Sequence, residues 1–218
     1  MIRKFSIPII IGTHFQISIF VCCLSLVGCN SAEKPLPIFG EREVVGGDTV
    51  YHTIADFQFV NQDSVVVTHE TFKGKIYVAD FFFTTCRTIC PIMKTQMARV
   101  NDAVKDMPDV LILSHSIDPE YDTVGLLHDF AERLGAKSDK WFFVTGKPRD
   151  YVFDIAQTSY FSTALEDKTE PDGFIHSGAF LLIDKERRIR GKYDGTKEDD
   201  VNRLLADIQR LENEYESN

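Results

Sequence analysis

An apolar run over residues 76–83, followed at once by two cysteines, constrains the fold of this chain more than any other feature. The run is rich in β-branched and aromatic residues and is interrupted only by Asp80. Such a segment is typical of a central strand that is covered on both faces. Thr84 and Thr85 can cap a following helix, and Pro91 suits the first turn of that helix. The stretch therefore predicts a buried strand, a short polar turn and the start of a helix.

The two cysteines, Cys86 and Cys90, lie where this strand passes into the helix N-terminus. The helix dipole and the free backbone N–H groups at that position favour a thiolate. The i, i+4 spacing puts both sulfur atoms on one side of a helical turn, so they can bond to each other or share a soft metal ion. The alternative is a pair of buried structural thiols, but Arg87 and small polar residues surround the pair. We therefore expect a redox-active or metal-binding dithiol.

The first 29 residues resemble an export signal. Arg3 and Lys4 form a positive start, and a mainly apolar stretch follows. A transmembrane anchor is the alternative, since it needs about 20 mainly apolar residues. The segment ends in Leu-Val-Gly-Cys29, which matches the bacterial lipobox and favours a lipoprotein signal peptide over residues 1–29. Cys29 is then the lipidated residue, and the protein is anchored to a membrane of the bacterial cell envelope with its domain outside the cytoplasm.

This interpretation leaves two thiols in the folded protein. Of the five cysteines, Cys22 and Cys23 would leave with the signal peptide and Cys29 would carry lipid. Cys86 and Cys90 remain, and in an exported protein they would oxidise to a disulfide unless a reductant or a metal holds them.

The rest of the chain predicts one folded domain. Residues 30–43 contain Ser, Pro and Gly and are predicted to be a flexible tether, and residues 44–218 the domain. The formal charge of −9 argues against nucleic acid as a partner. No glycine pattern for nucleotides and no hydrolase nucleophile motif is present in the sequence.

Strand and helix patterns alternate along this domain. Besides the central strand, we expect strands at 51–60, 65–68, 110–117, 141–145, 179–183 and 189–193, helices at 91–106, 124–134, 149–158 and 197–215, and a polar loop at 166–173. Asp122 or Thr123 can cap the second helix. Met93 and Met97 have helical spacing and are interpreted as core residues, with copper ligation as the alternative. The order of elements predicts an α/β fold, a thioredoxin-like three-layer sandwich with a central mixed sheet.

A histidine is the third candidate ligand. His176 comes just before the apolar strand 179–183, which we expect to form a hairpin beside the central strand. In a thioredoxin-like fold that placement brings His176 near the dithiol. The other histidines of the domain have no such context and are not proposed as ligands; they are His52, His69, His115 and His128.

The two stretches together resemble the Sco (SenC) family. The resemblance is carried by Asp-Phe-Phe-Phe-Thr leading into Cys86-x-x-x-Cys90-Pro91, and by His176-Ser177 before an apolar strand and an Asp. It implies a thioredoxin-like protein that binds copper and serves cytochrome oxidase assembly, with His176 as the copper-binding histidine. The family usually has Pro after the first Cys, where this chain has Arg87.

Two thiolates and one imidazole make a small, soft site for a copper ion, Cu(I) or Cu(II), whereas Zn²⁺ usually takes four ligands. The first hypothesis is a copper carrier that passes copper from Cys86, Cys90 and His176 to the copper-site subunit of cytochrome c oxidase. A thiol reductant or another copper carrier is expected as a further partner. The second hypothesis is a thiol–disulfide oxidoreductase in which Cys86 attacks and Cys90 resolves. Asp118 is expected to support the site, to face a partner, or to cap the next helix.

Overall fold

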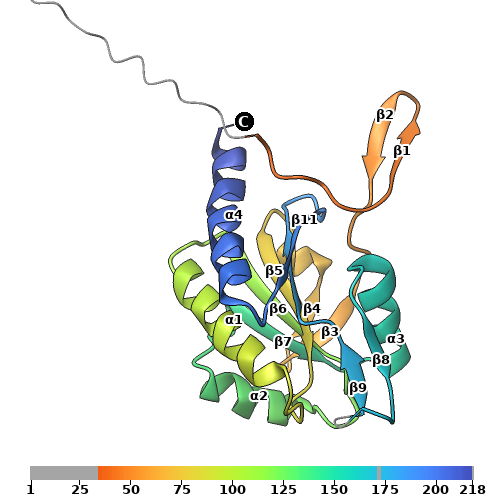
Figure 1. The fold of residues 1–218 in the computed structure, drawn as a ribbon, viewed down its shortest axis with the longest axis vertical. Coiled ribbons are helices and arrows are strands. Elements are labelled where there is room, and N and C mark those ends of the chain that lie inside the picture. Colours follow the sequence, from red (N-terminus) through yellow and green to blue (C-terminus); the bar gives the residue numbers. More distant parts are fainter. Residues whose placement is uncertain (1–33, 171–172, 218) are drawn as a thin grey trace, which may run out of the picture. The chain divides into compact units, whose positions relative to one another are not determined.

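A computed structural model describes residues 34–170 and 173–217. Its main sheet contains β3 (Gln58–Asn61), β4 (Val66–Thr68), β5 (Ile76–Phe82), β6 (Val110–Ser116), β7 (Trp141–Thr145), β10 (Ala179–Ile183) and β11 (Ile189–Asp194). The strand order is β11-β10-β5-β6-β7-β3-β4 (Figure 1). β5 is parallel to β6 and β6 to β7, while the other neighbours are antiparallel. The central mixed sheet is therefore confirmed.

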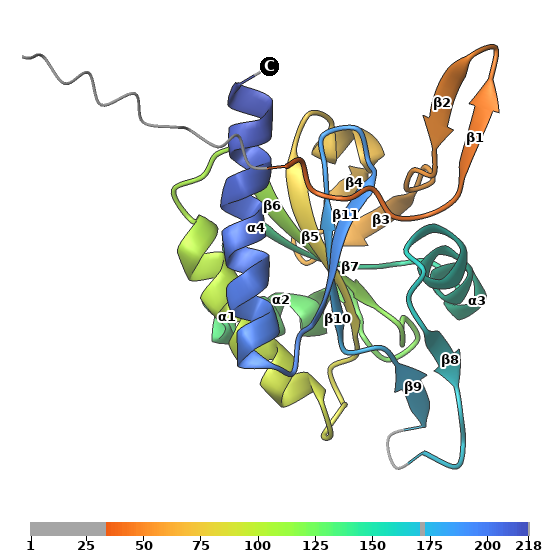
Figure 2. The same ribbon diagram turned by 45° about the horizontal axis from the view of Figure 1, so that its top comes forward.

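Helices cover both faces of this sheet and complete the three layers. α1 (Cys90–Val104), α2 (Val124–Arg133) and α4 (Glu198–Glu216) lie on one side, and α3 (Arg149–Asp154) lies on the other (Figures 1 and 2). The crossovers β5-α1-β6 and β6-α2-β7 step across the sheet in the same direction. Right-handed connections then place α1 and α2 on the same face. Because both faces are covered, every residue of β5 and β6 is buried.

Helix α1 begins differently from the expectation. Its N-cap residue is Ile89, which makes no side-chain cap hydrogen bond, while Pro91 does lie in the first turn. Thr84 and Thr85 are too far upstream to cap it, so that prediction is wrong. The helix buries Met93, Met97, Val100 and Val104 against the sheet, which confirms the two methionines as core residues.

The later helices follow their sequence signals closely. Thr123 caps α2 by accepting a hydrogen bond from the backbone N–H of Leu126, and Gly135 follows the helix with a positive φ of 66°. The residues Val201, Leu204, Ile208 and Leu211 form the buried stripe of α4. α3 continues into one turn of π-helix over Ile155–Ser159.

Two short hairpins differ from the sequence-based expectation. β1 (Arg42–Val45) and β2 (Asp48–Tyr51) pair around Gly46 and Gly47, so Tyr51 ends this hairpin instead of starting the strand that we expected over 51–60. The hairpin extends away from the main sheet (Figure 2). β8 (Ala164–Glu166) and β9 (Phe174–His176) pair where we expected mainly loop. Each pair forms because its two segments supply each other's backbone partners.

The N-terminal predictions fall mostly outside the described residues. Residues 1–33, with Cys29, are not described, so the signal peptide and its lipidation stay predictions. Of the predicted tether, Leu36 is buried and the backbone N–H of Phe39 donates to the carbonyl of Ile189 at 2.8 Å. Within residues 34–170 and 173–217, no helix combines the length and the apolar character that crossing a membrane requires.

Candidate metal centre

The loop between β5 and α1 is fastened to the neighbouring strand through Asp122. The carboxylate of Asp122 accepts hydrogen bonds from the backbone N–H of Thr84 at 3.2 Å, from the Thr84 hydroxyl, and from the Ser116 hydroxyl at 2.6 Å. Burial of this carboxylate raises its pKa, and the hydrogen bonds act in the opposite direction. Of the two residues that could cap α2, Thr123 is the cap, and Asp122 holds the cysteine loop instead.

The loop and the helix start present two cysteines side by side. Cys86 lies in the loop and Cys90 is the first residue of α1. Both are free thiols, with 8% of Cys86 and 4% of Cys90 exposed. Both cysteines are therefore buried, and both line a hollow between α1 and α2.

His176, at the end of β9, completes the cluster. Its Nε2 atom is 3.3 Å from the sulfur of Cys90 and 3.8 Å from the sulfur of Cys86. The three ligand atoms lie within 4.8 Å of one another. The ring of Phe83 meets the imidazole edge-on with centroids 5.5 Å apart, which fixes its orientation. The structure thus brings together the three residues that the sequence singled out.

The two thiols differ in charge. The hydrogen bond from Cys90 lowers the pKa of Cys86 to about 3, and hydrogen bonds with His176 and Thr88 act in the same direction, against the effect of burial. The same contact with Cys86, together with burial, raises the pKa of Cys90 above the usual range of a thiol. At neutral pH Cys86 is therefore the thiolate and Cys90 the thiol that donates to it.

The donor set fits a soft metal ion. Two sulfur atoms and one imidazole nitrogen suit Cu(I), which accepts two or three soft ligands. Among the described residues, the Nδ1 atom of His176 is buried and has no hydrogen-bond partner. Metal-ligating histidines usually have such a partner. The imidazole is therefore held by packing against Phe83, and Nε2 is the nitrogen that faces the sulfurs.

A buried ion pair that the sequence did not predict lies one helical turn along α1 from Cys90. The Nζ atom of Lys94 is 3.2 Å from the carboxylate of Asp80, and both side chains are almost wholly buried. The hydroxyl of Ser114 also donates to that carboxylate, and Nε1 of Trp141 donates to Ser114 at 2.9 Å. The Lys94 ammonium lies 3.6 Å above the ring of Phe82. The sequence signal was a single Asp inside an otherwise apolar strand.

Arg149 joins three segments around the histidine arm. Its guanidinium donates to Asp118 at 2.8 Å, to Glu120, and to Glu166 of β8 at 3.5 Å. It also lies 5.1 Å from the ring of Phe174 in β9. Asp118, expected to support the site, to face a partner or to cap a helix, is thus the partner of Arg149, and Thr123 is the cap.

The remaining histidines lie apart from the cluster. His115 is fully buried, stacks on Phe81 with centroids 4.8 Å apart, and has no hydrogen-bond partner for either ring nitrogen among the described residues. His52 bonds to the carbonyl of Ser159, while His69 and His128 lie beside carboxylates nearer the surface. Within the described residues, the Cys-Cys-His group is the one set of three such side chains that could hold a metal ion.

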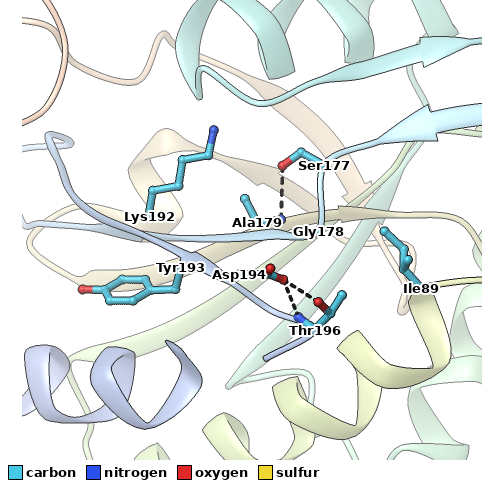
Figure 3. A pocket seen from close by; sticks show the side chains of 8 residues that line it. All are labelled: Ile89, Ser177, Gly178, Ala179, Lys192, Tyr193, Asp194 and Thr196. Carbon is cyan, nitrogen blue, oxygen red and sulfur yellow. Dashed lines mark hydrogen bonds between the residues drawn. The ribbon is translucent and has the colours of Figure 1, made fainter. Parts of the chain in front are cut away.

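A hollow opens at the turn that follows His176, where Ser177 and Gly178 line it (Figure 3). Ile89 from the cysteine loop faces Gly178 and Thr196 across it, and Lys192 lies on β11 at its edge. The Ser177 hydroxyl accepts a hydrogen bond from the backbone N–H of Ala179 at 3.1 Å, which shapes the turn after His176. A Cβ at Gly178 would come within 3.3 Å of Thr196, so the turn packs closely there.

Comparison with known proteins agrees with this geometry. A SCO1/SenC family lipoprotein from Bacillus anthracis is 30% identical, with a TM-score of 0.68 over 73% of this chain and 95% of that one. BsSco, described as a member of the Sco family of cytochrome c oxidase assembly proteins, is 31% identical, with a TM-score of 0.65 over 73% and 93%. Arabidopsis thaliana ScoI, solved with copper bound, is 25% identical, with a TM-score of 0.59 over 72% and 98%.

The SCO1/SenC family model matches residues 46–213. That range contains the whole main sheet, both cysteines and the histidine that the fold brings beside them. Sequence, fold and site therefore agree, and this chain belongs to the SCO1/SenC family.

Proposed function

We propose that the protein binds one copper ion through Cys86, Cys90 and His176. The observation that carries this proposal is the convergence of two sulfur atoms and one imidazole nitrogen within 4.8 Å. Three soft donors suit copper better than they suit Zn²⁺. The copper-bound structure of the Arabidopsis thaliana relative supports the same assignment.

Binding changes the protonation of one thiol. Cys86 is already a thiolate at neutral pH, so its sulfur can bind copper directly. Cys90 releases its proton to become the second thiolate ligand. Nε2 of His176 gives its lone pair, which places the ring proton on Nδ1. Two thiolates with Cu(I) leave one negative charge, and the nearby positive charge of Lys94 favours the thiolate form of Cys90.

We propose that the copper is delivered to the binuclear copper site of cytochrome c oxidase. The description of BsSco as a member of a family of oxidase assembly proteins supports this role. The ion would pass by ligand exchange, each bond to a sulfur of this protein being replaced by a bond to a ligand of the oxidase subunit. A thiol reductant or another copper carrier would return the site to its reduced, loaded state.

A lipid anchor would hold the protein at the membrane where the oxidase lies. We propose that the residues before Cys29 are removed and that Cys29 is then lipidated. The domain would lie in the cell envelope, outside the cytoplasm. The lipoprotein from Bacillus anthracis supports this placement. Metabolic labelling with a clickable fatty acid tests it: the wild-type chain should be labelled, and a labelled Cys29→Ser chain would contradict it.

An anaerobic Cu(I) titration against a competing chelator tests the copper site. The reduced chain, with Cys22, Cys23 and Cys29 replaced by serine, should bind one copper ion. His176→Ala should weaken binding about tenfold or more, because one of three donors is lost. His128→Ala, an exposed histidine on α2, is the matched control and should bind like wild type. Weak or non-stoichiometric copper binding that is the same in wild type and in His176→Ala would overturn the proposal.

The low pKa of Cys86 favours a second function, thiol–disulfide exchange. As a thiolate, Cys86 can attack a disulfide of the target protein, and Cys90 can then resolve the mixed disulfide. A disulfide switch has been identified in BsSco, which supports redox chemistry at the equivalent kind of site. The two functions are compatible, because thiols of a copper site must be reduced before they receive copper.

A further inference from the structure

A second hollow reaches the dithiol from the side of α1 and α2. Its volume is about 540 Å³, and Cys86 and Cys90 both line it, whereas His176 does not. Pockets of this size hold small molecules. The sulfur atoms can therefore be approached by a small ligand from a side that leaves the histidine in place.

The walls of this hollow are apolar with a basic component. Phe83, Ala98, Phe130 and Leu134 supply apolar surface, and the charged residues that line it are Lys94 and Arg133. No carboxylate lines it, although the chain has 33 acidic and 24 basic residues. The lining thus has a charge opposite to that of the whole protein.

Arg133 supplies the net positive charge. Lys94 is neutralised by Asp80, which is 3.2 Å away and outside the lining. Arg133 is exposed in the last turn of α2, and its guanidinium lies 5.6 Å from the ring of Phe130. Among the described residues it makes no ion pair within 4 Å. Its charge is therefore available to a ligand in the hollow.

We infer that this hollow, named here the α1–α2 pocket, binds low-molecular-weight thiols that carry a negative charge and brings them to the Cys86–Cys90 disulfide. The inference rests on the proposed dithiol function and deepens it, because it names the chemical class of the reductant. The anionic group pairs with Arg133 at the rim, the carbon chain lies on the apolar walls, and the sulfur points to the cysteines.

The exchange balances with two thiols. The first thiolate attacks the sulfur of Cys86, the more exposed of the pair. A mixed disulfide forms, the bond between Cys86 and Cys90 breaks, and the electron pair goes to the sulfur of Cys90, beside the Lys94 ammonium. The second thiolate attacks the small molecule's sulfur, forms a free disulfide and releases Cys86 as a thiolate. Two small thiols are oxidised as one protein disulfide is reduced.

Three thiols of matched length test this inference. They are 2-mercaptoethanesulfonate, which is anionic, 2-mercaptoethanol, which is neutral, and cysteamine, which is cationic. The oxidised full chain in detergent, with Cys22, Cys23 and Cys29 replaced by serine, is mixed with each thiol, and thiols are counted after acid quenching. Comparing each variant with wild type for the same thiol cancels the differences in intrinsic reactivity.

Arg133→Glu should slow reduction by the anionic thiol about fivefold, as expected for reversing one charge near a water-exposed pocket. The rate of reduction by the neutral thiol should change by less than about twofold, and the rate of reduction by the cationic thiol should rise. Added salt should shrink these differences. Arg42→Glu, the same charge change on the distant β1–β2 hairpin, is the control and should leave all three rates unchanged.

Equal changes for the three thiols, or no change, would overturn the inference while leaving the copper site and the dithiol intact. Failure of Cys86 and Cys90 to form a disulfide on oxidation would overturn both this inference and the dithiol chemistry. A loss of selective copper binding in the separate titration would overturn the copper carrier alone. The three failures are therefore distinguishable.

Discussion

At the scale of single residues, Cys86 and Cys90 share one proton and so differ in reactivity. The hydrogen bond from Cys90 lowers the pKa of Cys86 to about 3, while Cys90 holds its proton. The folded reduced protein therefore carries a thiolate at Cys86 far below the pH at which a free cysteine ionises. Such a sulfur is ready to bind a metal ion or attack a disulfide without losing a proton first.

This difference predicts a pH profile. Alkylation of the reduced protein by iodoacetamide should modify Cys86 first, at a rate that stays nearly constant between about pH 5 and pH 8, because its pKa lies below that range. Peptide mapping by mass spectrometry identifies the modified residue. Cys90→Ser replaces the thiol donor by a hydroxyl and should return part of the ordinary pH dependence. A rate that rises tenfold per pH unit in wild type would contradict the assignment.

At the scale of elements, the histidine arm formed by β8 and β9 depends on Arg149. The guanidinium holds Glu166 of β8, lies by Phe174 of β9, and binds Asp118 in the loop after β6. Phe174 in turn packs on Phe83, with centroids 5.0 Å apart, next to the cysteine loop. One side chain thus connects the strand that carries His176 to the loops around the dithiol.

Arg149→Met should weaken Cu(I) binding about tenfold, because the arm loses its ionic contacts and holds His176 less well over the sulfurs. The rate at which iodoacetamide alkylates Cys86 should change by less than about twofold, because Asp122, and not Arg149, holds the cysteine loop. Arg149→Lys keeps the charge and should recover part of the affinity. A loss of copper affinity equal to that of His176→Ala together with a large change in alkylation would show general damage to the site.

How far the sequence predicts these elements depends on where their partners lie. β5 and α1 are signalled locally, by an apolar run and by methionines and valines at helical spacing, and both were found. β8 and β9 have only three residues each and form because they pair with each other, which local patterns do not reveal. Arg149 and its carboxylates are far apart in sequence, so their contact appears only in the fold. His176 was found because its motif, as well as its neighbours, could be recognised.

At the scale of the whole folded domain, the metal centre and Leu36 lie at opposite ends of the main sheet. The cysteines follow the end of β5, and His176 precedes the start of the antiparallel β10. Leu36 contacts the other end, where the guanidinium of Arg190 donates to its carbonyl at 2.8 Å. Leu36 and the metal centre are therefore separated by about the length of the seven-residue strand β5, roughly 23 Å.

Substitution of Arg190 tests whether the end of the sheet near Leu36 stabilises the fold independently of the metal centre. Its side chain is 5% exposed and pairs with the fully buried Asp184 at 3.2 Å and with Glu214 at 2.6 Å. Arg190→Met should lower the free energy of unfolding by about 3 kcal/mol, because a buried carboxylate loses a partner. Urea denaturation measures this loss. Arg203→Met is the control, because this side chain is 62% exposed, and it should change the free energy of unfolding by less than about 0.5 kcal/mol.

Copper affinity of the folded Arg190→Met protein should equal that of wild type, because the substitution is remote from the ligands and distant effects are additive. The titration must be made well below the denaturation midpoint, where the variant stays folded. A parallel fall in stability and copper affinity would mean that the two ends of the sheet are coupled. Unchanged affinity in a less stable protein would instead show that the end of the sheet at Arg190 supplies stability, and that the loops at the other end determine copper binding.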